Sequence, residues 1–336
     1  MTDSSGNVPS ERPRSILKEI AGVSWEHPAD RAALQTVRAV PGFNEAVKKI
    51  VGFFGERGIR LIFQANAVRV GPSQFPRLHH LMTEVTTTMD WPEQPPLFVS
   101  QTPMVNAGAV GVDHPFIVLN SGAVNLLDDD ELRVLLGHEL GHVMSGHALY
   151  RTVTILILTL GFRNLPFLAG IVLLPIQLAL LEWYRKSELS ADRAGLLASQ
   201  DRDSSMQVFL KLAGGGSMTD TNLEAFMEQA KEYQNMGGPL DAIFKIINTL
   251  GMTHPFNTLR AAELQDWIDS GAYTTIMNGQ YTHRGQEEEE RPLTADLGDA
   301  ARHYAQEAKE TVSQVTDAAK RAASAFTEAF KDKDKK

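Results

Sequence analysis

The chain has 336 residues, of which 43% are hydrophobic and 22% are charged, and it contains no cysteine. This composition excludes a fibrous or wholly disordered protein, and a formal net charge of -9 argues against a nucleic-acid partner. Without cysteine there is no disulfide, thiolate cluster or cysteine nucleophile, so any metal site must use His, Asp and Glu. Residues 1–13 are polar with no apolar run behind them, so we expect a cytoplasmic protein.

The first third of the chain predicts a small α+β layer behind a flexible lead-in over residues 1–28. Apolar residues then recur at helical spacing up to Gly55. The Pro41-Gly42 pair interrupts this run, which predicts two helices. The remaining pattern favours an extended segment, a helix and two strands, over residues 58–70, 76–89, 96–100 and 115–119.

A further helix is predicted to begin at the acidic residues Asp128 to Asp130. Its apolar residues fall on one face, at Leu132, Leu135, Leu136, Leu140 and Val143. This helix carries the motif H-E-x-x-H, formed by His138, Glu139 and His142. The spacing puts both imidazoles on one side, one turn apart, where they can share a tetrahedral metal. Glu139 can then act as general base toward a water at the open position, and a chance match is the alternative.

A second half-site lies downstream in the segment Glu188-Leu189-Ser190-Ala191-Asp192. Glu188 can be the third protein ligand, which completes the set of two histidines, a glutamate and a water. Asp192, one turn later, can accept a hydrogen bond from a zinc-binding histidine, through the ring nitrogen that does not bind the metal. The alternative is a solvated charged face beside Arg185, Lys186 and Arg193.

Taken together, these motifs resemble the CAAX prenyl protease and HtpX-type zinc metallopeptidases, which belong to the gluzincins. The resemblance extends from about Asn106 to Leu264. Besides the two half-sites it includes Asn106-Ala107-Gly108-Ala109, Pro115-Phe116-Ile117-Val118-Leu119, Leu127 to Leu132, Thr253-His254-Pro255 and Arg260. Several ordered motifs are more specific than any one of them.

The resemblance implies an α+β, mostly helical gluzincin-type fold with a small edge sheet and an active-site helix. It implies that His138, His142 and Glu188 bind one zinc ion per chain and that Glu139 is the catalytic base. Asp192 and Arg260 would support these ligands from behind. The implied activity is that of a metalloendopeptidase acting on polypeptides.

The substrate cleft is expected along an edge strand that contains Asn106, Ala107, Phe116 and Val118, as the resemblance implies. Main-chain pairing at a sheet edge binds any extended sequence and leaves pockets to select side chains. An ordinary core strand is the alternative for these residues.

Two other histidines need separate interpretations. His254 can stabilise the developing oxyanion, or it can occupy the fourth zinc position in a closed resting state, and both roles stay open. His147 would lie about 140° away from His142 on a continuous helix, so we expect a surface or capping residue outside the metal ligands.

The apolar stretch 152–184 separates the two zinc half-sites. A single membrane crossing would put His142 and Glu188 on opposite faces, and two crossings need about forty residues plus a turn. We therefore expect an apolar helical hairpin that turns near residues 163–166 and returns on the same side. It packs either in the protein core or into one leaflet as a monotopic or peripheral contact.

The metallopeptidase domain is predicted to cover residues 29–280. Residues 281–336 form an acidic linker and an Ala-rich tail in which apolar residues recur about every 3.7 residues, as in a straight helix. Because most of them are alanine, a solvated helix is favoured over an amphipathic helix on a membrane or on the hairpin.

The expected function is therefore a zinc metalloendopeptidase acting on polypeptides, with protein quality control at a membrane as an analogy from the family. The alternative is a zinc-stabilised, chaperone-like binding protein whose site is closed, for instance by His254. A dedicated prenyl-protein protease is disfavoured, because such an enzyme needs an intramembrane chamber and more spanning segments.

Overall fold

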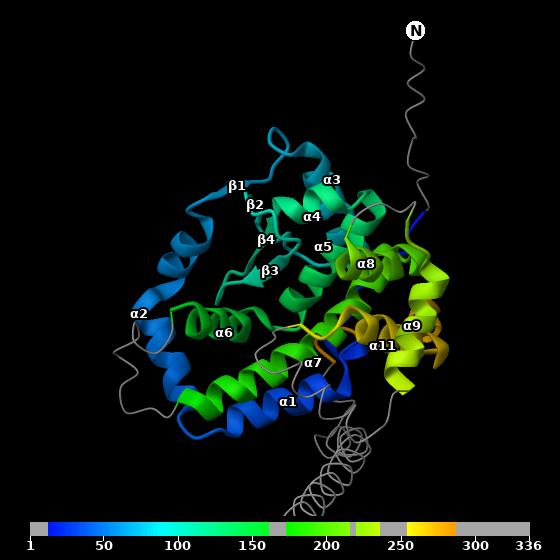
Figure 1. Ribbon diagram of the computed structural model, residues 1–336. Coiled ribbons are helices and arrows are strands. Elements are labelled where there is room, and N and C mark those ends of the chain that lie inside the picture. The colour runs from blue at the N-terminus through cyan, green and yellow to red at the C-terminus, as the bar shows by residue number, and fades with distance from the viewer. Residues whose placement is uncertain (1–12, 161–172, 216–219, 236–253, 287–336) are drawn as a thin grey trace, which may run out of the picture.

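Helices α5 (Asp129–Met144) and α7 (Leu173–Ser199) pack against each other at the centre of the computed structural model (Figure 1). The structure describes residues 13–160, 173–215, 220–235 and 254–286. α5 begins with a capping box, in which the Asp128 carboxylate accepts from the Glu131 backbone N–H and Glu131 accepts from the Asp128 N–H, at 3.0 and 2.9 Å. These bonds satisfy two N-terminal donors of the helix, so the predicted helix start is confirmed.

Small residues allow α5 and α7 to approach each other closely. A Cβ atom added at Gly137 would lie 2.4 Å from the Cβ of Ala198, and one added at Gly141 would lie 2.4 Å from the Cβ of Ala194. Any larger residue would therefore force the helices apart. Both turns of the H-E-x-x-H motif are held directly against the helix that carries Glu188.

The strands of the described chain form one mixed sheet in the order β1-β2-β4-β3. β1 (Ala67–Arg69) pairs antiparallel with β2 (Leu97–Ser100), and β2 pairs parallel with β4 (Phe116–Asn120). β3 (Ala107–Val110) pairs antiparallel with β4 and forms an edge of the sheet. Because β3 also packs on α5, this edge lies next to the motif helix.

This strand order corrects part of the expected substrate cleft. Phe116 and Val118 lie on β4, which is paired on both sides, and Phe116 is fully buried. Only Asn106 and Ala107 lie at the beginning of the edge strand. The two strands are close in sequence, so the pattern alone did not show which of them is the outer one.

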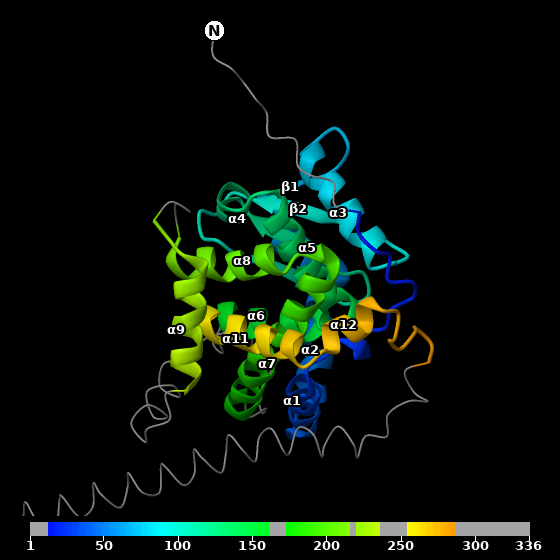
Figure 2. The same cartoon turned by 90° about the vertical axis from the view of Figure 1, so that its right-hand side faces the viewer.

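The remaining described helices surround this centre. α8, α9 and α11 pack against one another on one side of the molecule (Figure 2). The helices are η1 (Gly22–Ser24), α1 (Pro28–Ala39), α2 (Phe43–Gln64), α3 (Pro76–Thr88), α4 (Ser121–Leu126), α6 (Ala148–Leu160), α8 (Arg202–Gly214), α9 (Leu223–Asn235), α11 (Asn257–Asp269) and α12 (Ala272–Met277). The predicted break at Pro41-Gly42 is confirmed, since it separates α1 from α2. The extended segment predicted over residues 58–70 is wrong for most of its length, because α2 continues to Gln64.

The described parts of the apolar stretch 152–184 pack inside the protein. α6 and the first half of α7 share a hydrophobic cluster with α1 and α2, through buried residues that include Val37, Phe43, Leu156 and Trp183. Leu174 and Leu178 of α7 are exposed, at 59% and 51%. Within the described residues no helix is both long and apolar enough to cross a membrane. The expected turn near residues 163–166 and the tail helix lie outside the described residues.

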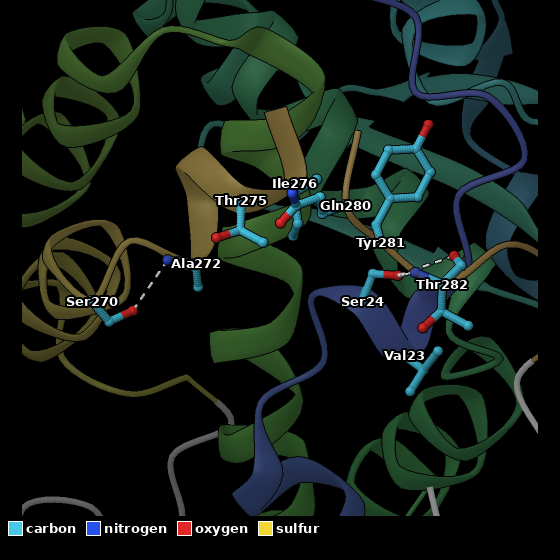
Figure 3. Close-up of a pocket in the computed structure, with 9 residues that line it drawn as sticks. All are labelled: Val23, Ser24, Ser270, Ala272, Thr275, Ile276, Gln280, Tyr281 and Thr282. Carbon is cyan, nitrogen blue, oxygen red and sulfur yellow. Dashed lines mark hydrogen bonds between the residues drawn. The ribbon is translucent and has the colours of Figure 1, made fainter. Parts of the chain in front are cut away.

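Residues 13–28 belong to the fold, so the expected flexible lead-in is wrong for this part. Ile20 and Trp25 are at most 1% exposed and fill a core under β2 and α3. Figure 3 shows the pocket where this segment meets the residues after α12. There the Ser24 hydroxyl donates to the Thr282 carbonyl at 3.2 Å, and the Thr282 N–H donates to Ser24 Oγ at 3.1 Å.

Candidate metal centre and active site

The two motif histidines meet Glu188 between α5 and α7. His138 Nε2 lies 3.3 Å from Glu188 Oε2, and His142 Nε2 lies 3.4 Å from Glu188 Oε1. One ligand atom from each residue lies within 4.8 Å of the other two, and all three residues are buried. The structure therefore brings the two half-sites of the sequence together.

The chemistry of these three residues fits a divalent metal ion. Two imidazole nitrogens and a carboxylate are the protein ligands that zinc takes in hydrolytic sites, where a further position serves water or substrate. Glu188 is fully buried, and its Oε2 has no hydrogen-bond partner among the described residues. His138, His254 and Arg260 lie 3.3 to 3.8 Å from this oxygen, so a cation bound there would give a buried carboxylate oxygen the direct partner that it lacks.

Asp192 and Arg260 support His138. His138 Nδ1–H donates to Asp192 Oδ1 at 2.9 Å, so Nε2 is the ring nitrogen that faces Glu188 and that can bind a metal once it has lost its proton. Arg260 of α11 donates to both oxygens of Asp192, at 2.9 and 2.6 Å. Burial opposes a charge on His138, but the Asp192 and Glu188 carboxylates outweigh burial and raise the pKa of His138 to about 9. His138 therefore gives up a proton when it takes a metal at neutral pH.

His147 supports His142 from the opposite side. The Nδ1 atoms of the two rings are 3.0 Å apart, and His147 Nε2 lies 3.2 Å from Asp30 Oδ2. His147 is only 2% exposed, so the expected surface position is wrong, although it does lie outside the ligand triad. The reason is Gly146, whose φ of 68° ends α5 and folds His147 back under its last turn.

Arg151 is a buried cation that the sequence patterns did not single out. Its Nη1 donates to His142 Nε2 at 2.6 Å and also to Glu188 Oε1, and its guanidinium stacks over the Tyr184 ring at 4.4 Å. These acceptors are the lone pairs that a metal would use, so Arg151 and a metal compete for them. The signal was an arginine one turn after His147 in an otherwise apolar helix, where a buried charge needs a partner.

Glu139 lies on the same helix between the ligands and is 2% exposed. Burial raises the pKa of Glu139, and Arg151, His138 and a hydrogen bond from the Ala109 backbone offset this only in part. Its Oε2 has no hydrogen-bond partner within the described segments. A buried carboxyl with a raised pKa can accept a proton near neutral pH and return it, which is what a general base in hydrolysis must do.

A pocket of about 380 Å³ opens beside the triad. Asn106 and Ala107 line it where the edge strand β3 begins. Most of the other lining side chains are apolar, including Val134, Leu135, Val208, Phe209, Leu212 and Phe256. An apolar pocket with a few polar groups next to a sheet edge can hold an extended peptide and one of its side chains.

His254 closes one wall of this pocket. Its Nε2 lies 3.6 Å from Glu188 Oε2, and its ring packs edge-on against Tyr184 with centroids 5.6 Å apart. Burial lowers the pKa of His254, although Glu188 partly opposes this change. A neutral imidazole at this distance has a lone pair to offer a cation and an N–H to offer an anion, so both expected roles remain compatible with its position.

Metallopeptidases of the H-E-x-x-H type cut peptide bonds with a metal held in this way, next to a buried proton acceptor. The fold and the site place the chain in that class. Comparison with known sequences agrees, since residues 72–268 match Peptidase family M48, and the chain belongs to this family. The expected resemblance is thereby confirmed, and as a metallopeptidase the protein acts on polypeptides.

Individual relatives support the assignment over different lengths. The chain is 34% identical over 270 residues to the chloroplastic plastoglobule-localized metallopeptidase 48 of Arabidopsis thaliana, which covers 79% of this chain and 78% of that protein. It is 31% identical over 114 residues to a protease HtpX homolog of Moorella thermoacetica, covering 33% of this chain and 36% of the relative. The HtpX homolog of Bifidobacterium longum is 24% identical over 250 residues, 66% of this chain and 80% of the relative. No solved structure matches the chain.

Proposed function

We propose that this protein is a zinc-dependent endopeptidase that holds one zinc ion through His138, His142 and Glu188. The observation that carries the proposal is the buried triad beside Glu139, at the mouth of a pocket that begins at the edge strand β3. Bound zinc would polarise the scissile carbonyl and make water a better nucleophile.

The edge strand supports cleavage within a polypeptide. β3 forms an edge of the described sheet, so an extended peptide can pair with it through main-chain hydrogen bonds, which accept any sequence. A peptide held in this way continues beyond the site in both directions, and therefore an internal bond lies beside Glu139. Glu139 would take a proton from the attacking water and pass it to the leaving amine.

The first experiment compares wild type with Glu139→Gln on an unfolded protein such as casein, with bound zinc quantified in both. We expect Glu139→Gln to lower turnover by about 10²–10⁴-fold at equal zinc content, because only the proton acceptor is lost. Glu131→Gln is the matched control, since Glu131 is a fully buried carboxylate on the same helix that faces Lys211. Equal cleavage by wild type and Glu139→Gln would contradict the role of the base, and absence of zinc from wild type would contradict the metal.

The two roles proposed for His254 predict opposite results. If His254 stabilises the oxyanion, His254→Ala lowers turnover and leaves zinc affinity nearly unchanged. If His254 is a closing ligand, His254→Ala raises turnover and weakens zinc binding. The second result would also favour the latent, binding-protein form of this site in the resting chain.

We also propose that the protein works at a lipid surface, as a peripheral protein with a role in protein quality control. The exposed leucines Leu174 and Leu178, at the beginning of α7, support this location. The name of the Arabidopsis relative places that protein at plastoglobules. Flotation with liposomes tests the proposal: wild type should float, and Leu174→Glu with Leu178→Glu should not. Failure of wild type to float would contradict the location and leave the peptidase proposal intact.

A further inference from the structure

On the side that faces away from Glu188, His142 begins a series of buried hydrogen-bonding groups that ends at Asp30. His142 Nδ1 contacts His147 Nδ1 at 3.0 Å, and His147 Nε2 contacts Asp30 Oδ2 at 3.2 Å. His142, His147 and Asp30 are each at most 2% exposed, so water does not substitute for any of these contacts. The geometry therefore fixes where each proton lies.

Arg151 determines which atoms donate and which accept in this series of hydrogen bonds. A guanidinium N–H can only donate, so the Nε2 atom of His142 that faces Arg151 Nη1 at 2.6 Å must carry a lone pair. The proton of neutral His142 is then on Nδ1, and His147 Nδ1 must accept it. His147 in turn carries its proton on Nε2, where the Asp30 carboxylate accepts it.

Asp30 is itself held in place by α7. Trp183 Nε1 donates to its Oδ1 at 2.9 Å, and the Ser190 hydroxyl donates to its Oδ2 at 2.6 Å. Both donors lie on the helix that carries Glu188. The carboxylate at the end of this series is therefore fixed relative to the third ligand of the triad.

The turn after α5 brings His147 within hydrogen-bond distance of His142. Gly146 adopts a φ of 68°, and the His147 backbone N–H donates to the His142 carbonyl at 2.9 Å, while the Gly146 N–H donates to Val143 at 3.1 Å. This is the hydrogen-bond pattern of a Schellman motif, which packs the second residue after the cap against the last turn of the helix. The turn that ends the motif helix therefore places His147 in this series of hydrogen bonds.

We propose that His147 and Asp30 are positioning residues for the metal centre, which hold His142 with its Nε2 lone pair directed at the metal. Asp30 lies on α1, outside residues 72–268. A helix beyond the matched family region therefore contributes to metal affinity. The inference rests on the proposal that the chain binds zinc.

The test measures the zinc affinity of the full chain by competition with a chromophoric chelator. His147→Ala should weaken zinc binding by about 10–100-fold, the range seen when a group that orients a metal ligand is lost. His147→Asn should stay within about threefold of wild type, because its side-chain oxygen can lie where Nδ1 lies and accept the same proton. Asp30→Asn should weaken binding less than His147→Ala does. Glu131→Gln, the buried control in the first turn of α5, should bind zinc like wild type.

Each outcome decides between the proposals. Zinc binding by His147→Ala equal to wild type would overturn the positioning role, as would an equal loss in His147→Asn. Failure of wild type itself to bind zinc would instead overturn the proposed metal. If His147→Ala does not fold, His147→Asn is compared with His147→Gln, whose oxygen lies nearer the Nε2 position. Tighter binding by the Asn variant supports the role, and equal binding contradicts it.

Discussion

The two motif histidines reach a buried carboxylate by different routes. His138 donates directly to Asp192, on the same helix as Glu188 and paired with Arg260. His142 reaches Asp30 only through a second imidazole, and its cation, Arg151, contacts the ligands themselves. The difference teaches that the His138 side is complete within α5, α7 and α11, whereas the His142 side depends on the turn after α5 and on α1.

The largest expected effect is on protein stability, and zinc should change it for Arg151 but not for Arg260. Arg151→Met should destabilise the metal-free protein by about 3–5 kcal/mol, because it removes the buried guanidinium that donates to Glu188 and lies 4.0 Å from Glu139. Saturating zinc should remove most of this loss, since the metal replaces the charge. Arg260→Met should cost a similar amount with and without zinc, because in both states the buried Asp192 loses the two hydrogen bonds from Arg260 and keeps only the one from His138.

Urea unfolding in chelator and in zinc measures both variants. A loss of stability in Arg151→Met that is the same in the two buffers would show that Arg151 and the metal do not share His142 and Glu188. The proposed difference between the surroundings of His138 and those of His142 would then be wrong.

The next effect concerns the direct route to His138. Asp192→Asn should weaken zinc binding by about 10–100-fold, because the amide is a poorer acceptor for His138 Nδ1–H and is not matched to Arg260. Chelator competition measures the change beside His147→Ala. If Asp192→Asn binds zinc as wild type does, the hydrogen bond from His138 to Asp192 does not determine how strongly His138 binds the metal.

A packing change tests both sides separately, because Gly137 lies next to His138 and Gly141 next to His142. Replacing either by alanine puts a Cβ 2.4 Å from an alanine of α7, so each variant should lose about 1–3 kcal/mol and bind zinc less tightly. Gly52→Ala on α2 is the control, since its Cβ meets nothing within 4 Å. Wild-type stability in both variants, from thermal unfolding, would contradict the close approach of the helices.

The smallest expected effect depends on pH. Burial opposes the charge on Asp30, but His147, Ser190 and Trp183 outweigh burial and hold the pKa of Asp30 below its ordinary value of 3.8. The unfolded chain therefore takes up this proton at a higher pH than the folded chain does. This stabilisation is complete above the ordinary pKa and is lost as the pH falls through the folded pKa.

Urea curves of metal-free wild type and Asp30→Asn between pH 7 and pH 3.5 check this prediction. The difference in unfolding free energy should be largest near neutral pH and should shrink below about pH 4. A difference that does not change with pH would mean that Asp30 contributes through its shape alone.

The sequence predicted the motif side of this site well because its signals are local. The acidic cap at Asp128 and the i, i+4 spacing of His138 and His142 each depend on a single helix. Glu188 was proposed because it lies in a second half-site with Asp192 downstream of H-E-x-x-H, and the family resemblance supported this choice. The support of His142 was missed because one residue, Gly146, turns the chain, and because Asp30 reaches the site only through tertiary packing. The assignment of Phe116 to the edge failed for a related reason, since strand order is not encoded in the pattern of one strand.

One continuous helix joins the surface of this protein to its metal triad. α7 runs from Leu173 to Ser199, about 40 Å at the usual rise per residue, with exposed leucines near one end and Glu188 about three to four turns later. The exposed leucines and the third residue of the triad therefore belong to one rigid element, and Gly137 and Gly141 leave little clearance between this element and the motif helix.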